Sequence, residues 1–510
     1  MSQAKAVPPL TSQKTSKEMK TGLLWIWIPL SVVGATVAAA LVYWALAHFL
    51  GSNLVPPEVK PNVLDPYDLA RSTAVLLGII AATVGIVVAL RRQVAQEKIL
   101  VLSREDLDLR QAVEDARRNE AVAVERQRVL ELREQRAADR LNELRGRYVT
   151  CAQQLGHDEE AIRLAGAYGM AQLASEWEDP AQRQSCVDVL CAYLRMPVKS
   201  PEGRPVEENQ REVEVRRSVT RIVTSHLRPG SKDYWTGVSV NLAGAQLVEG
   251  DFRGVVVGGT ADFSNATFLE SAYFADALFE DEANFQRAVF MENCSFTKAR
   301  FAKQANFDHL TCQGRATFTS ATFSGVFSSR GSDFVGRSVF SSAKFQKSAN
   351  FEESSFSAPA GFATTYFGSD AVFEGTLFKS DANFYQSKFM GGAGFKKVEF
   401  TGTLRFDKSY FKGRAGFNEA IFMSRSSFQE VTFDGGLKMA NVSAQSEVML
   451  DWSRIRKNWT LEGSKFDMHF GVARVFTENT PLTLGAIFSK RVNWEAVEVA
   501  EGMEMSASVD

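Results

Sequence analysis

Phenylalanine recurs at a constant interval in this chain of 510 residues, from Phe263 to Phe433. The steps alternate between five and six residues, so two interleaved series, one from Phe263 and one from Phe268, each advance by eleven. Phenylalanine is missing only once in each series, at Ser329 and at Cys312. A strict period of this kind is typical of a solenoid, in which each repeat contacts only its neighbours. The period therefore predicts the architecture of this segment and supplies little chemistry.

The residues between the rings favour β-structure over a helix. An eleven-residue period also occurs in helical supercoils, but positions five apart would lie roughly 140° apart on a helix. The intervening residues are largely Gly, Ser, Thr, Asn and Asp, which are poor helix formers. A small residue stands two positions before most rings, and in extended backbone such a pair points to the same side. Where the ring is missing, Leu310 and Phe327 take the place of the small residue, so the inward volume is roughly restored.

The repeats resemble those of pentapeptide-repeat proteins, whose unit reads Ala-(Asp/Asn)-(Leu/Phe)-x-x. Residues 261–268 (Ala-Asp-Phe-Ser-Asn-Ala-Thr-Phe) and 283–290 (Ala-Asn-Phe-Gln-Arg-Ala-Val-Phe) carry the resemblance, and 241–247 comes close to the strict five-residue form. Over residues 237–445 it implies a right-handed quadrilateral β-helix. The sixth residue in every second face departs from the family pattern and implies about 22 residues per coil, hence nine or ten coils. The place of this extra residue is left open.

Two apolar segments, 23–50 and 73–90, are each long enough to cross about 30 Å of hydrocarbon as a helix. We therefore expect an N-terminal tail (1–21) followed by two transmembrane helices within 22–91, and not a cleaved signal peptide. Lysine and arginine residues flank this pair of segments, whereas the connector 51–70 holds one lysine and three acids. The positive-inside rule then predicts a multi-pass protein of the plasma (inner) membrane, with both termini cytosolic and a short external loop. Its five cysteines would lie in a reducing compartment.

Residues 92–147 are rich in Arg, Glu, Ala and Leu and predict one long α-helix. Small or apolar residues recur every seven positions from Leu102 to Leu144, which gives one strand of a coiled-coil seam. The complementary positions are mixed, since Val113 and Leu141 fit the seam and Glu120 does not. Two interpretations stay open: a solvated helix that continues from the second span, and a self-associating stalk.

Residues 148–236 change to short helical patterns, which are typical of a small HEAT-like helical bundle. The predicted helices are 160–174, one that begins at Pro180, and 213–227. Such a bundle would also cap the open end of the solenoid. Segments 154–168 and 189–195 resemble the linker domain of bacterial, chiefly actinobacterial, membrane proteins with two spans and C-terminal pentapeptide repeats. This second resemblance implies the architecture of the whole chain and no activity.

No combination of residues predicts catalysis or metal binding. The five histidines are scattered, and Cys186 and Cys191 lack partners at zinc spacing. The chain has no phosphate-binding loop, dinucleotide-binding motif or nucleophile elbow. His309 and Cys312 are spaced like a nucleophile and its base, but no third group orients them. We therefore assign no catalytic, cofactor-binding or metal residue, and expect a non-enzymatic protein without a cofactor.

Charge bears on one known activity of pentapeptide-repeat proteins, the inhibition of type II topoisomerases by a rod that imitates DNA. Such a rod has to be acidic, whereas residues 241–440 contain 21 acids and 20 bases. The topoisomerase inhibitor is therefore a disfavoured alternative. Without exposed aromatic side chains among the bases, binding of nucleic acid is disfavoured as well.

The last segment, residues 446–510, keeps apolar side chains but departs from the phenylalanine repeat. We expect irregular final coils and a cap there, followed by a frayed acidic tail. The favoured hypothesis for the whole chain is a scaffold that the bilayer anchors and that presents a cytosolic β-solenoid to a protein partner. The alternative is an oligomerising membrane effector, or a sensor of stress or phage infection, in which copies assemble through the stalk.

Overall fold

The computed structural model describes residues 66–197, residues 206–479, and isolated positions within 30–48 and 483–499. The chain divides into two units, Met1–Glu134 and Gln135–Asp510, and each is described by itself. The first predicted transmembrane helix, 23–50, lies largely outside the described residues.

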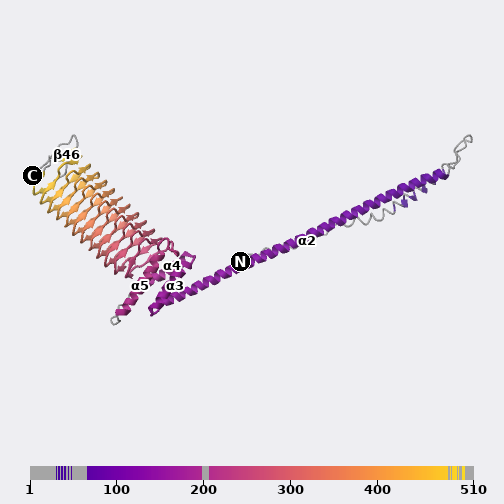
Figure 1. Cartoon of the computed structure of the whole chain (residues 1–510). Helices are drawn as coiled ribbons and strands as arrows, with labels where there is room; N and C mark the ends of the chain where they lie inside the picture. Colours follow the sequence, from indigo (N-terminus) through magenta and orange to yellow (C-terminus); the bar gives the residue numbers. More distant parts are fainter. Residues whose placement is uncertain are drawn as a thin grey trace. The chain divides into compact units, whose positions relative to one another are not determined.

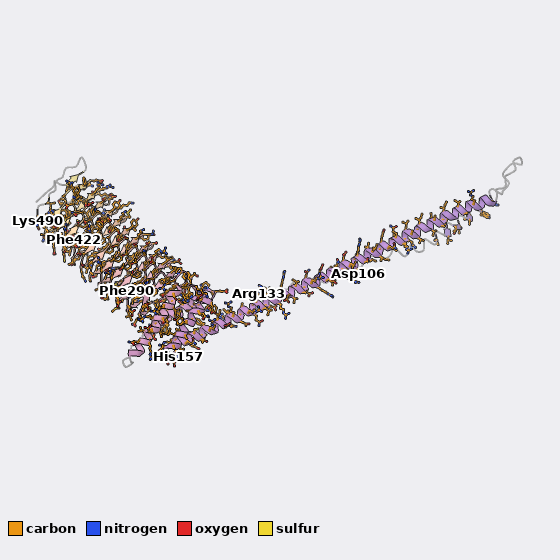
Figure 2. The ribbon with its side chains drawn as sticks, viewed as in Figure 1. Asp106, Arg133, His157, Phe290, Phe422 and Lys490 are labelled. Carbon is orange, nitrogen blue, oxygen red and sulfur yellow. The ribbon has the colours of Figure 1, made fainter. Side chains whose placement is uncertain are left out.

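Helix α2 (Pro66–Leu155) is continuous, so the predicted second span and the predicted stalk are parts of one helix. Its part from Gly78 onward contains an apolar stretch of 18 residues, long enough to cross a membrane and buried nowhere within the protein. By length and composition this is one candidate span among the described residues. The stalk portion is exposed on all sides over most of its length, and the side chains of Asp106 and Arg133 point away from the helix (Figure 2).

Three further helices form a bundle with the last turns of α2: α3 (Glu160–Glu176), α4 (Pro180–Arg195) and α5 (Val206–His226). The Asp179 carboxylate accepts a hydrogen bond from the backbone N–H of Ala181 at 3.0 Å and caps α4, whose first residue is Pro180. Helix α5 begins seven residues before the predicted start at residue 213. The early residues, Val-Glu-Glu-Asn-Gln, are largely polar and give no apolar period.

The end of α2 packs closely on α3 because two residues of α3 are glycine. A Cβ atom on Gly166 would lie 2.8 Å from the backbone N of Leu155, and one on Gly169 would lie 2.7 Å from the Cys151 Sγ. Leu144, Cys151 and Leu155 are buried in the same core. The bundle therefore includes the C-terminal turns of the long helix as well as the residues that follow it.

The C-terminal part is a β-solenoid of about eleven coils with four parallel sheets (Figure 1). Almost every strand is two residues long and pairs with the strand one coil further on. Ala261 is the register partner of Ala283, and Ala283 of Ala305, so the coil repeat is 22 residues. The chain visits sheets A, B, C and D in turn, so sheet A lies opposite sheet C and sheet B lies opposite sheet D.

Sheets A and C have eleven strands each. Sheet A contains β1 (Val240–Asn241), β5 (Ala261–Asp262), β9 (Ala283–Asn284), β13 (Ala305–Asn306), β17 (Phe327–Ser328), β21 (Ala349–Asn350), β25 (Ala371–Val372), β29 (Ala393–Gly394), β33 (Ala415–Gly416), β37 (Leu437–Lys438) and β41 (Trp459–Thr460). Sheet C contains β3 (Gly250–Asp251), β7 (Ala272–Tyr273), β11 (Cys294–Ser295), β15 (Ala316–Thr317), β19 (Ser338–Val339), β23 (Ala360–Gly361), β27 (Ala382–Asn383), β31 (Leu404–Arg405), β35 (Ser426–Ser427), β39 (Val448–Met449) and β43 (Phe470–Gly471).

Sheets B and D have twelve strands each. Sheet B contains β2 (Gln246–Leu247), β6 (Thr267–Phe268), β10 (Val289–Phe290), β14 (Thr311–Cys312), β18 (Asp333–Phe334), β22 (Ser355–Phe356), β26 (Leu377–Phe378), β30 (Glu399–Phe400), β34 (Ile421–Phe422), β38 (Ser443–Ala444), β42 (Lys465–Phe466) and β45 (Ile487–Phe488). Sheet D contains β4 (Val256–Val257), β8 (Leu278–Phe279), β12 (Arg300–Phe301), β16 (Thr322–Phe323), β20 (Lys344–Phe345), β24 (Tyr366–Phe367), β28 (Lys388–Phe389), β32 (Tyr410–Phe411), β36 (Thr432–Phe433), β40 (Arg454–Ile455), β44 (Val475–Thr477) and β46 (Val497–Val499).

The phenylalanine rings fill the interior as four columns, one behind each sheet. Rings one coil apart are stacked, as in the pair Phe263 and Phe285, whose centroids are 4.8 Å apart with planes 5° from parallel. Rings of different columns meet edge to face, both across the interior, as Phe263 does with Phe274 at 5.7 Å, and between neighbouring columns, as Phe268 does with Phe274 at 5.8 Å. Both arrangements are favourable for aromatic pairs. The small residues two positions earlier, such as Ala261 and Ala266, are also buried, which confirms the predicted pairing of ring and small side chain.

The extra residue of every second step lies in the wider of two kinds of corner. Two residues separate Phe263 from the inward Ala266, whereas three separate Phe268 from the inward Ala272. The narrower corner is a β-turn in which the N–H of Ala266 donates to the carbonyl of Phe263 at 3.1 Å. Its third residue has a positive φ, and this recurs every eleven residues from Asn265 (φ 55°) onward.

The regular coils continue beyond residue 445, so the prediction of irregular coils within 446–510 is wrong for the part up to Thr477. Strands of all four sheets keep the 22-residue register there, as in the pairing of Leu437 with Trp459 and of Val448 with Phe470. Leucine, valine, isoleucine and tryptophan take over the inward positions, which preserves the fold and hides the period. The prediction of nine or ten coils is too low for the same reason.

Candidate interaction surfaces of the solenoid

One end of the rod is covered by the helical bundle, as the sequence predicted. The Gln184 side chain of α4 donates to the Ser239 carbonyl at 3.0 Å and accepts from the Ser239 N–H at 2.8 Å. The N–H of Val256, the first residue of β4, donates to the carbonyl of Leu227. The Trp235 indole stacks on His226 with ring centroids 4.3 Å apart. The first coil therefore has partners for its exposed backbone and apolar surface, and this end is closed to other chains.

Charged side chains of α5 reinforce this contact at its edge. Arg221 pairs with Glu249 at 2.7 Å, and Arg217 pairs with Glu270 at 3.0 Å. Within the bundle, the buried guanidinium of Arg216 donates to Glu212 and to the carbonyls at the end of α4, so its charge is compensated. The cap is thus held by both apolar packing and hydrogen bonds.

The interior deviates from the ring columns at the two predicted positions, Cys312 and Ser329. Both residues are buried. The Phe327 ring replaces the ring that is missing at Ser329, between Phe307 and Phe351. Its centroid lies 5.6 Å from that of Phe307 and 5.1 Å from that of Phe351. The compensation expected from Phe327 is therefore confirmed.

The residues His309 and Cys312 do not form a nucleophile pair. His309 is an exposed residue at a corner, with φ 57°, whereas the Cys312 thiol lies inside the rod. The neighbour of that thiol is the equally buried Cys294, at an Sγ–Sγ distance of 3.4 Å. Burial raises the pKa of Cys294 well above its ordinary value, so the thiol is held in its neutral, unreactive form.

The cysteines of the bundle are core residues. Cys186 and Cys191 are fully buried, and burial raises the pKa of each thiol to about 12. A metal ion would need thiolates and further ligands. In the part of the chain that the structure describes, no group of three or more His, Cys, Asp or Glu residues is placed to hold a metal ion.

The outward side chains of the four sheets, together with the corners, form the accessible surface of the rod. Sheet D presents a run of outward residues, one per coil, that we call the basic column; it consists of the basic Arg300, Lys344 and Lys388, the aromatic Tyr366 and Tyr410, and Thr322. Register pairing places Tyr366 between Lys344 and Lys388 on adjacent strands. The side chain of Tyr366 is 37% exposed, so the expectation that the bases of the rod lack exposed aromatic neighbours is wrong.

Sheet B, on the opposite side, presents a run that we call the mixed column; it consists of the acidic Asp333 and Glu399, the apolar Leu377 and Ile421, and Ser355. A near-zero net charge over the repeats thus conceals two faces of different character. A charge summed along the chain does not reveal these faces, because it adds the outward residues of all four sheets together. The sequence contains this information at the positions just before the rings of the Phe268 series. Taking every twenty-second such position gives the outward residues of one sheet.

Corner residues make most of the ion pairs of the rod, and these run from coil to coil. Lys396 pairs with Glu374 at 3.3 Å, and Lys303 pairs with Asp281 at 2.9 Å. Such exposed pairs contribute little stability, on the order of 0–1 kcal/mol each. In contrast, Lys344 and Lys388 have no acidic partner within 4 Å among the described residues.

Comparison with known families supports the architecture. The model of pentapeptide repeats (9 copies) matches residues 242–289, 263–311 and 395–443. No curated protein and no solved structure matches the chain. The matched segments lie within the four-sheet solenoid, whose strands carry the ring and small-residue pairs quoted above. This C-terminal domain is therefore a pentapeptide-repeat β-solenoid.

Proposed function

We propose that the chain is a membrane-anchored, non-enzymatic scaffold that presents its solenoid to a protein partner in the cytosol. One observation carries the proposal: the inward side chains are nearly uniform, whereas the outward side chains differ from coil to coil along four continuous sheets. The uniform interior builds the rod, and the varied exterior is available for recognition. The separation of His309 from Cys312 supports a role without catalysis.

The physical basis of such a scaffold is its rigidity. The strands pair in register, and stacked rings such as Phe318 and Phe340, with centroids 4.7 Å apart, fill the interior. A surface that is ordered before binding loses little conformational entropy when a partner arrives. The apolar stretch in α2 supports the membrane anchor, because a bilayer would cover side chains such as Ile79 and Ile86 that are otherwise exposed.

Site-specific photo-crosslinking of the full-length protein in its native membrane tests the proposal. A photoreactive amino acid is placed at one outward position on each sheet of a single coil: Asn306, Thr311, Thr317 and Thr322. We expect crosslinks to the same protein from at least one sheet, and no crosslink to it when the probe replaces the exposed Val122 of the stalk. Failure of all four positions to capture a protein would contradict the scaffold.

A second candidate, the oligomerising effector or sensor, is favoured by the stalk. Leu102, Leu109 and Leu130 are 63%, 65% and 56% exposed on α2, which is costly for a helix that stays alone in water. A coiled coil with a second copy would cover them. Replacing all three by glutamine should abolish association through the stalk and, if assembly is the signal, the response of cells to stress or phage. Unchanged mass of the protein in detergent would rule out this role for the stalk.

A further inference from the structure

The two opposite faces of the rod match each other in charge and in apolar character. The lysines of the basic column, Lys344 and Lys388, are exposed and have no salt-bridge partner among the described residues. The acids of the mixed column, Asp333 and Glu399, likewise have no base within salt-bridge distance in the part of the chain that the structure describes. Other charged residues of the rod, such as Lys408 and Glu430, pair within the chain at 3.7 Å. The central charges of sheets B and D are thus free for a partner.

The spacing along the rod also matches. Each strand of sheet D follows a strand of sheet B by half a coil, so its level lies between two successive strands of sheet B. Strands stack at about 4.8 Å, so the offset is about 2.4 Å. The level of Lys344 therefore lies between those of Asp333 and Ser355, and the level of Lys388 lies between those of Leu377 and Glu399, so each lysine has one acid as a neighbour in level.

The aromatic residues of the basic column likewise lie next in level to apolar residues of the mixed column. Tyr366 lies next in level to Leu377, and both are partly exposed, at 37% and 38%. Tyr410 lies next in level to Ile421. Two rods that run in the same direction without a shift along the axis therefore bring each lysine within half a coil of an acid and each tyrosine within half a coil of an aliphatic residue.

We propose that sheet D of one molecule docks on sheet B of a second copy that runs in the same direction. The two contact surfaces lie on opposite sides of one rod, so the contact is heterologous and each added copy presents a free face to the next. The result is a row of parallel rods. The match ends further along the rod, where Arg454 lies next in level to Lys465 and like charges oppose each other.

A polyanion such as nucleic acid is the competing occupant of the basic column. Lysine alternating with tyrosine would suit phosphates and stacked bases. That occupant leaves the mixed column of sheet B unexplained, including the exposed Leu377 between the acids. A second copy accounts for both faces with one contact.

Charge reversal on the full-length protein in detergent tests the row. One variant carries Lys344→Glu and Lys388→Glu, and the other carries Asp333→Lys and Glu399→Lys. Like charges across a contact disfavour association by several kcal/mol, so each variant alone should lose at least about tenfold in the association constant of rod–rod contacts. An equimolar mixture should regain it, because the acidic sheet D of the first variant meets the basic sheet B of the second. Mass photometry measures the size distribution in each sample.

Two controls separate this contact from other effects. Arg405→Glu with Lys438→Glu changes the net charge by the same amount as the first variant does, but on sheets C and A, and should leave the rows intact. Lys388→Cys on one copy and Glu399→Cys on another should form an intermolecular disulfide on mild oxidation, because the proposed contact brings the two positions together. The five natural cysteines are buried and do not compete.

Two results would overturn the proposal. One is an unchanged size distribution for both charge-reversal variants. The other is binding of a single-stranded oligonucleotide that the first variant loses, while the second variant self-associates like the natural protein. Neither result bears on capture of another protein by photo-crosslinking, so the scaffold and the row can fail separately.

Discussion

The Ser329 hydroxyl is a buried polar group inside an apolar rod, and it has no hydrogen-bond partner among the described residues. Other inward hydroxyls are satisfied: that of Ser387, for example, donates to the carbonyl of Phe362 in the preceding coil at 2.8 Å. The sequence shows both serines at inward positions, but it does not show which of them reaches a carbonyl. That depends on the position of the side chain relative to the corner below it.

Replacing Ser329 by alanine should therefore leave the stability unchanged or raise it by about 1 kcal/mol, since an unsatisfied buried hydroxyl is removed. The matched change Ser387→Ala should lower it by about 1 kcal/mol, because the Phe362 carbonyl loses one of its two donors. The midpoint of urea unfolding measures both effects. An equal loss in the two variants would show that Ser329 is bonded in solution.

The thiols of the bundle predict a loss of stability at alkaline pH. Burial raises the pKa of Cys186 and of Cys191 to about 12, from 9.0 for an unperturbed thiol. Below pH 9 both states are protonated, so the full stability is present. As the pH rises from 9 to 12, the unfolded thiols ionise first and the folded state loses stability. Tryptophan fluorescence of the bundle, from Trp177 and Trp235, should show an unfolding midpoint that falls over this range.

A variant with Cys186→Ala and Cys191→Ala provides the comparison for this pH dependence. Its unfolding midpoint should fall less steeply between pH 9 and 12, although Tyr193, whose pKa burial also raises to about 12, retains part of the slope. Identical slopes in the two proteins would mean that other groups dominate the alkaline transition.

At the scale of helices and strands, periodic residues were predictable and close approaches were not. The position of the rings predicted every inward face from Phe263 to Phe433, and Pro180 predicted the start of α4. The coils after residue 445 were missed because the period persists there in residues of different kinds. The contact of α2 with α3 was missed because Gly166 reveals its role only when Cys151 lies against it.

A glycine in a wider corner and a glycine in a strand differ in how closely the neighbouring coil approaches. A Cβ atom on Gly413 would collide with the carbonyl group of Gly391 in the coil before, whereas one on Gly416 would have Ala393 O at 3.9 Å as its nearest neighbour. Gly413→Ala should therefore destabilise the rod by about 1–3 kcal/mol through backbone displacement. Gly416→Ala should be neutral or stabilising, because alanine restricts the unfolded chain. A urea midpoint of Gly413→Ala that is equal to or higher than that of Gly416→Ala would contradict the steric explanation.

For the whole molecule, the sequence predicted the domain types and left the surfaces undetermined. The net charge of the repeats depends on composition alone, and 21 acids against 20 bases do not show that charge is separated between two sides of the rod. This separation appears only when residues 22 apart are stacked into one sheet, which places Lys344 and Lys388 on one side and Asp333 and Glu399 on the other. The candidate interaction surfaces are therefore a property of the coil repeat more than of any single motif.

Attachment to the membrane should depend on the apolar character of the two predicted spans. Arginine at the centre of a transmembrane helix costs about 2.5–3.5 kcal/mol. Val37 and Val84 lie near the middle of the two predicted spans, so Val37→Arg with Val84→Arg should move most of the protein from the carbonate-washed membrane pellet to the supernatant. Val113→Arg with Val124→Arg places the same charges on exposed stalk positions and should leave the protein in the pellet. If the natural protein itself is released by carbonate, or if the first variant stays in the pellet, the two segments do not anchor the chain.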